Sequence, residues 1–85
     1  MEKRVGFVGI IIEDRRKVSD QINHIISEFG EIVLARVGLP YKEKHVSVIT
    51  LIVDATTDEV GALTGKLGAL EGVSVKSGLS KLDGK

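Results

Sequence analysis

The chain has 85 residues, with 12 basic and 12 acidic side chains and no cysteine. This balance lacks the basic excess of nucleic-acid-binding proteins, and the lack of cysteine excludes disulfides and thiolate metal sites. A domain of this size buries only about 60% of the surface of its unfolded chain, so we expect self-association to add stability.

The first part of the chain predicts a strand followed by a helix. Residues 4–13 are rich in β-branched and aromatic types, which favour a strand. This run is too short to span a membrane or to serve as a secretory signal, so we expect a cytoplasmic protein with no membrane partner. Apolar residues then recur on one helical face over residues 18–29, with Asp14 as the candidate cap and Gly30 as the candidate left-handed residue after the helix.

The remaining elements follow as strand, strand, helix, strand. Residues 31–39 predict the second strand, and Pro40 marks its end or a place on a sheet edge. A polar hairpin leads to a second strongly apolar run, residues 45–54. Residues 55–58 supply capping side chains for a second helix, and the more polar residues 73–79 suit a strand at a sheet edge.

The order strand, helix, strand therefore occurs twice, as in a duplicated βαβ unit. Right-handed crossovers place the first and third strands at the centre of an antiparallel sheet, with both helices on one face. The sequence thus predicts an α+β fold, a ferredoxin-like βαββαβ sandwich with a four-stranded antiparallel sheet. Residues 1–80 form this single domain, and residues 81–85 are expected to be a frayed tail.

The two central strands are apolar on both faces, whereas a two-layer monomer should alternate apolar and polar residues. We assign five side chains to the face away from the helices, as an interface: Phe7, Ile11, Ile49, Leu51 and Val53. A second copy of the chain is the most economical cover, in a dimer or a tetramer. The alternative is that a small sheet tolerates some exposed aliphatic residues.

The predicted second helix carries Gly61, Gly65 and Gly68 at intervals of four and three. Each glycine inside a helix costs about 1 kcal/mol relative to alanine. Close approach of a neighbouring helix or of a ligand would explain these glycines. The alternative is a helix of low intrinsic stability.

A basic cluster, residues 15–17, falls in the first turn of the first helix. It could hold an anion together with the free N–H groups of that turn. The alternative is a solvated cluster that pairs with Glu13 and Asp14, as surface charges usually do.

No catalytic or metal centre is expected. His24 and His45 are the only histidines and could bind a metal only with carboxylates or across subunits. Residues 61–67 superficially resemble a phosphate-binding loop, but the glycine spacing and the residue after lysine do not fit. No serine has a plausible base, so we expect no enzyme activity and no cofactor.

Four stretches resemble a known family: residues 12–15, residues 36–41, residues 72–76 and, most specifically, Val-Gly-Ala-Leu-Thr-Gly-Lys-Leu-Gly at residues 60–68. On these stretches the chain resembles the ACT-like family of iron-only hydrogenase system regulators. That family is related to ACT domains and to the C-terminal domain of nickel-responsive repressors. The resemblance covers nearly the whole chain and implies a ferredoxin-like fold and a regulatory role.

ACT domains typically bind small effectors, often amino acids, at subunit interfaces near the first strand-to-helix loop. Carried over to this sequence, and joined to the glycines of the second helix, the resemblance implies a ligand-binding set: Glu13, Asp14, Arg15, Arg16, Gly61 and Gly65.

The leading hypothesis is a non-enzymatic, oligomeric regulatory domain whose subunit interface binds a small-molecule effector. We expect no direct binding of nucleic acid. The alternative is an assembly subunit that binds a partner enzyme through its apolar sheet face or a free edge strand, without sensing a ligand. A third class, metal trafficking, would show as tightly bound metal.

Overall fold

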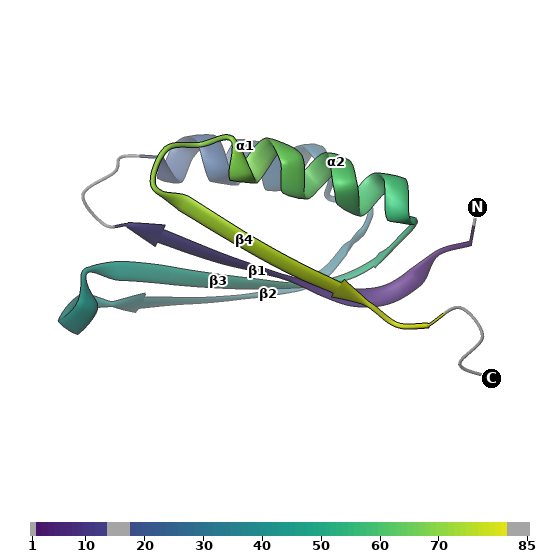
Figure 1. Cartoon of the computed structure of the whole chain (residues 1–85), viewed down its shortest axis with the longest axis horizontal. Coiled ribbons are helices and arrows are strands. Elements are labelled where there is room, and N and C mark those ends of the chain that lie inside the picture. Colours follow the sequence, from purple (N-terminus) through teal and green to yellow (C-terminus); the bar gives the residue numbers. More distant parts are fainter. Residues whose placement is uncertain (1, 14–17, 82–85) are drawn as a thin grey trace.

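The computed structural model describes residues 2–13 and 18–81. Two helices lie side by side on one face of a four-stranded sheet (Figure 1). A short 3-10 helix joins the second and third strands, and the elements in chain order are β1 (Arg4–Glu13), α1 (Ser19–Glu28), β2 (Val33–Tyr41), η1 (Lys42–Lys44), β3 (Val46–Ala55), α2 (Thr57–Gly68) and β4 (Val73–Leu79). The predicted ferredoxin-like βαββαβ fold is confirmed.

The strand order is β2-β3-β1-β4, and every neighbouring pair is antiparallel. The two apolar strands β1 and β3 are central, as predicted, and pair along their whole length from Arg4↔Ala55 to Glu13↔Val46. At one end of the sheet the first and last strands are tied together. The Ser80 N–H donates to the Val5 carbonyl oxygen at 2.8 Å, and Arg4 Nη1 donates to the Ser80 carbonyl oxygen at 3.0 Å.

The ends of the elements agree in part with the bounds and caps predicted from the sequence. β1 and β4 have the predicted bounds, and Pro40 lies within β2, a strand at the sheet edge where its missing N–H is tolerated. Gly30 does not take the left-handed conformation expected of it; among the described glycines that conformation belongs to Gly72, with φ of 79°. The predicted cap Asp14 lies outside the described residues.

The core lies between the helices and the sheet. Its fully buried side chains come from both layers, and the largest of those that are less than 2% exposed are Val8, Ile10, Ile22, Leu51, Val53, Leu63 and Leu67. Burial of these side chains is the main stabilising contribution to a domain of this size.

One prediction about the sheet faces is wrong. Ile49, Leu51 and Val53 do not lie on the face away from the helices but in the core beneath them. Leu51 is paired across from Val8, and directly opposed residues project to the same face of a sheet. Because both faces of β3 are apolar, the sequence pattern alone did not show which set points toward the helices.

Candidate functional site

The sheet face away from the helices carries a set of exposed apolar side chains, which we call the open-face patch. It consists of exposed residues on β1, β2 and β3: Val5, Phe7, Ile11, Val37, Leu39, Tyr41 and Ile52. Phe7 is paired with Ile52 in the register of β1 and β3. The side chain of Val37 is 66% exposed. Exposed apolar patches of this kind mark interaction sites in soluble proteins.

Charged side chains on this face stand at its edges. Lys76 lies on the edge strand β4, opposite Gly9, while Glu13 and Asp54 lie near the two ends of the central strands. An apolar centre with a polar rim is the usual composition of a protein interface.

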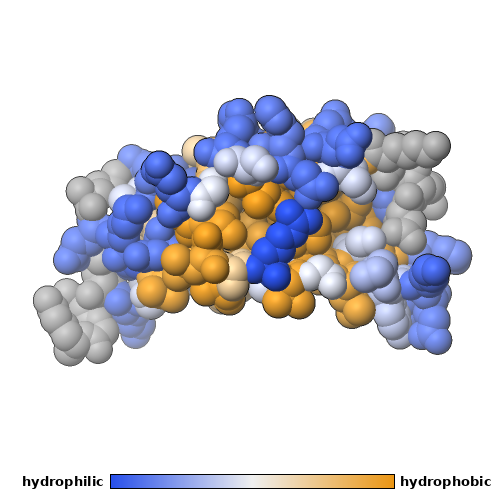
Figure 2. Space-filling view, turned by 180° about the vertical axis from the view of Figure 1, so that it is seen from behind, coloured by the Kyte–Doolittle hydropathy of each residue, from blue (hydrophilic) through white to orange (hydrophobic). Residues whose placement is uncertain are grey.

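A groove runs between α1 and the edge strand β2. Its volume is about 300 Å³, and its apolar lining includes Ile12 of β1, Ile22 of α1 and Ile49 of β3. Figure 2, which views the molecule from behind, shows apolar surface gathered on this side below a polar upper rim. Arg36 of β2 reaches α1, where its Nη2 donates to Asn23 Oδ1 at 2.8 Å.

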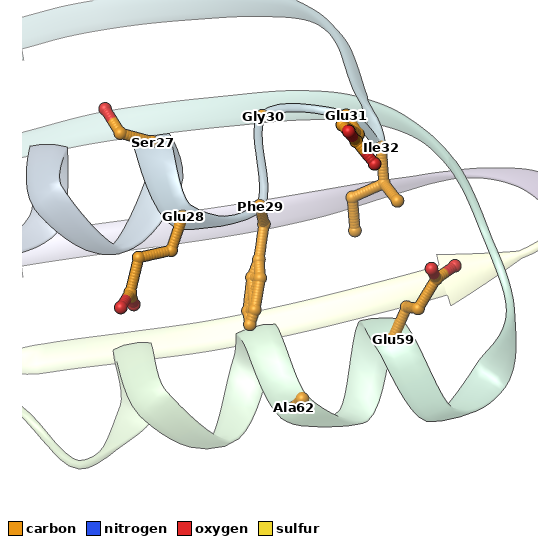
Figure 3. Close-up of a pocket in the computed structure, with 8 residues that line it drawn as sticks. All are labelled: Ser27, Glu28, Phe29, Gly30, Glu31, Ile32, Glu59 and Ala62. Atoms are coloured by element: carbon orange, nitrogen blue, oxygen red, sulfur yellow. The ribbon is translucent and has the colours of Figure 1, made fainter.

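A second hollow, of about 560 Å³, lies between the end of α1 and the start of α2. Its side chains, drawn in Figure 3, include Phe29 and three carboxylates. Two of those carboxylates make interactions that stabilise the helices. Glu28 pairs with Lys66 at 3.2 Å, and Glu59 forms a reciprocal capping box with Thr56. We therefore read this hollow as a product of helix packing.

Metal-binding residues are sparse in the described part of the chain. Within residues 2–13 and 18–81, no group of three or more His, Cys, Asp or Glu side chains is placed to hold a metal ion. His24 and His45 are both exposed, and His45 takes a left-handed conformation, with φ of 57°, at the end of the η1 turn. Neither described helix is long and apolar enough to cross a bilayer.

Residues 4–77 match the family described as "TM1266-like: Iron-only hydrogenase system regulator, putative". The chain belongs to this family. The match spans both βαβ halves and includes β1, the open-face patch and the groove. The resemblance inferred from the sequence is confirmed.

Solved structures support the same placement. An uncharacterized protein, TM1266, from Thermotoga maritima shares 41% identity over 94% of this chain and 100% of its own, with a TM-score of 0.89. The ACT domain from GTP pyrophosphokinase of Chlorobium tepidum, in its solution structure, shares 26% identity over 96% of this chain and 92% of its own, with a TM-score of 0.72. No curated protein sequence matches the chain. This member of the TM1266-like family thus has an ACT-like fold.

Of the predicted ligand-binding set, Glu13, Gly61 and Gly65 lie among the described residues. Asp14, Arg15 and Arg16 lie outside the described residues. Glu13 ends β1, where its N–H donates to the Gly72 carbonyl oxygen at 3.0 Å.

Gly61 and Gly65 lie on the exposed side of α2, and a Cβ built on either meets nothing within 4 Å. The neighbouring helix expected against these glycines is therefore not supplied by the described part of this chain. Gly61 also lies in the half of α2 that follows β3, toward the sheet end where Ala55 pairs with Arg4, and Glu13 is at the other end.

The sequence analysis did not identify the groove or the guanidinium group of Arg36 beside it. Arg36 is directly opposite Leu51, so it leaves β2 on the helix side, where an apolar residue would be expected. A charge at a core-facing position of an otherwise apolar strand was the available signal.

Proposed function

We propose that this protein is a non-enzymatic regulatory domain that works as a homo-oligomer, with a second copy covering the open-face patch. The observation that carries the proposal is the patch itself, an apolar surface spanning three adjacent strands of the sheet. Membership of a regulator family and an ACT-like fold support the regulatory role.

The charges around the patch favour a second copy as its cover. A rim of a single sign would repel an identical rim, but this rim carries both signs, with Lys76 on β4 and Glu13 and Asp54 near the strand ends. A two-fold axis brings the same surface of two copies together, so the patch must be compatible with itself. A small domain also gains most from such burial, because its own core is limited.

Light scattering at micromolar concentration tests the oligomer. We expect a particle mass at least twice the 9.1 kDa of the chain. Ile52→Lys, which places a charge within the patch, should lower the mass toward that of the monomer while circular dichroism stays unchanged. Gln21→Lys is the matched control, since it adds the same charge at an exposed position of α1 in the helix layer. A monodisperse 9.1 kDa wild-type particle would refute the proposal.

The regulatory part of the proposal requires an effector that binds one packing arrangement better than another, because only differential affinity shifts an equilibrium. A thermal-shift panel of metabolites and metal ions measures this. At least one compound should raise the melting temperature at saturation. If the oligomer forms but no compound changes its melting temperature, sensing is rejected and the assembly-subunit alternative takes its place.

A further inference from the structure

We infer that the groove between α1 and β2 binds a small aliphatic monocarboxylate, with Arg36 pairing with the carboxylate and the apolar side chains of the groove holding the hydrocarbon chain. The inference rests on the proposed function, because it names the class of effector. It concerns a site on one chain, however, and can be tested separately from oligomer formation.

The floor of the groove is built for a hydrocarbon. Ile12 and Ile22 are 6% and 1% exposed, so they are fixed in the core, and Ile49, which is 9% exposed, extends the apolar lining along the sheet. The volume of about 300 Å³ lies at the lower end of the range for small-molecule sites, which are mostly apolar with a few polar groups that fix orientation.

Arg36 supplies the orienting charge. Within the described residues its recorded partner is the neutral amide oxygen of Asn23. A guanidinium has five N–H donors, so several remain for a ligand, and its planar fork matches the two oxygens of a carboxylate. An ion pair formed beside an apolar floor is screened less than one in open water.

The other polar residues of the lining favour an anion over a cation. Ser19, Asn23 and Ser47 are neutral, and no aspartate or glutamate is among the lining residues that the structure describes. Among these described lining residues an ammonium group would therefore find no counter-charge, which disfavours amines and free amino acids.

The start of α1 also favours an anionic ligand. Ser19 is the first residue of this helix, and Val18 at the N-cap makes no side-chain cap hydrogen bond. The positive end of the helix dipole favours negative charge. Asp20, the acidic residue of this turn, lines a different hollow, with His24 and Leu70.

Isothermal titration with 4-methylpentanoate tests the inference on the full chain. Wild type should bind the acid saturably, and Arg36→Gln should weaken binding at least tenfold. Arg4→Gln is the matched control, since it removes the same charge from a strand end that does not line the groove and should leave the affinity unchanged.

Two analogues make the result independent of any variant. The neutral amide of the same acid should bind wild type at least tenfold more weakly than the acid, because it lacks the charge that Arg36 would pair with. Leucine, which adds an ammonium group, should also bind more weakly. Absence of acid binding, equal affinity in Arg36→Gln, or tighter binding of leucine would each overturn the inference.

Light scattering of the same samples separates the two proposals. An oligomer that does not bind the acid refutes the assignment of the groove and leaves the oligomer standing. A monomer that binds the acid refutes the oligomer and supports the assignment of the groove.

Discussion

The ring of Phe7 lies against Gly78 on the open face of the sheet. The two residues are paired across β1 and β4, and a Cβ on Gly78 would come within 2.8 Å of the ring Cζ and 2.9 Å of Cε2. The aromatic ring thus covers a position that has no side chain, an arrangement that stabilises glycine in edge strands.

Gly78→Ala should therefore force the Phe7 ring to move, at a cost of about 1–2 kcal/mol in the free energy of unfolding. Urea titration followed by circular dichroism measures this cost. Gly38→Ala is the matched control, because a Cβ there meets nothing within 4 Å. Equal stabilities of the two variants would mean that the ring does not rest on Gly78.

Neighbouring residues of β3 should respond in opposite ways to a charge. Val53 is fully buried beneath the helices, whereas Ile52 is 39% exposed on the open face. Val53→Lys should abolish folding, since an unpaired buried ammonium costs several kcal/mol, comparable to the whole stability of a small domain. Ile52→Lys should fold, and thermal unfolding of the pair provides the comparison. An unfolded Ile52→Lys beside a folded Val53→Lys would reverse the assignment of the faces.

The exposed glycines of α2 should be replaceable by alanine with a gain in stability. Space around Gly61 and Gly65 is open, and alanine in a helix interior is favoured by about 0.5–1 kcal/mol over glycine. Each substitution should therefore raise the melting temperature by a few degrees. A loss of stability at one of these positions would indicate that another molecule packs against the glycine side of α2.

The capping box at the start of α2 predicts a pH dependence. The Thr56 N–H donates to Glu59 Oε1 at 2.9 Å, and this hydrogen bond lowers the pKa of Glu59 from its ordinary value of 4.5, against a smaller opposing effect of desolvation. A lowered pKa in the folded state contributes stability above pH 4.5, and that stability is lost as the pH falls through the folded-state value.

Glu59→Gln keeps the capping hydrogen bond but removes the charge, so it isolates this effect. Wild type should be more stable than Glu59→Gln at pH 7, and the difference should shrink as the pH falls below 4.5, as measured by urea unfolding at each pH. A difference that persists unchanged at pH 3 would contradict the assigned role of the carboxylate.

The sequence was sufficient for the fold because its two apolar runs are the two central strands and because helix and strand periods differ clearly. It was insufficient for the orientation of β3. Val48 and Ile52 form one apolar set and Leu51 and Val53 the other, so period-two alternation does not choose between them. The choice depends on pairing with β1, a contact distant in sequence.

The lining of the groove could not be predicted from the sequence for a related reason. Arg36 and Asn23 are 13 residues apart and belong to different layers, and the lining comes from two strands and a helix besides the strand of Arg36. Local patterns identify a strand that contains an arginine, but they do not show what that arginine reaches. Only the assembled fold brings the guanidinium to the rim of an apolar groove.

The two hydrogen bonds between Arg4 or Val5 and Ser80 join strands from opposite ends of the chain (Figure 1). A short linker could therefore close the chain at that point, while a new opening at Lys42–Lys44 would leave every strand beside its present neighbours. Such a circular permutant would carry the same open face and the same groove. The architecture depends on which strands are adjacent rather than on the order in which they are synthesised.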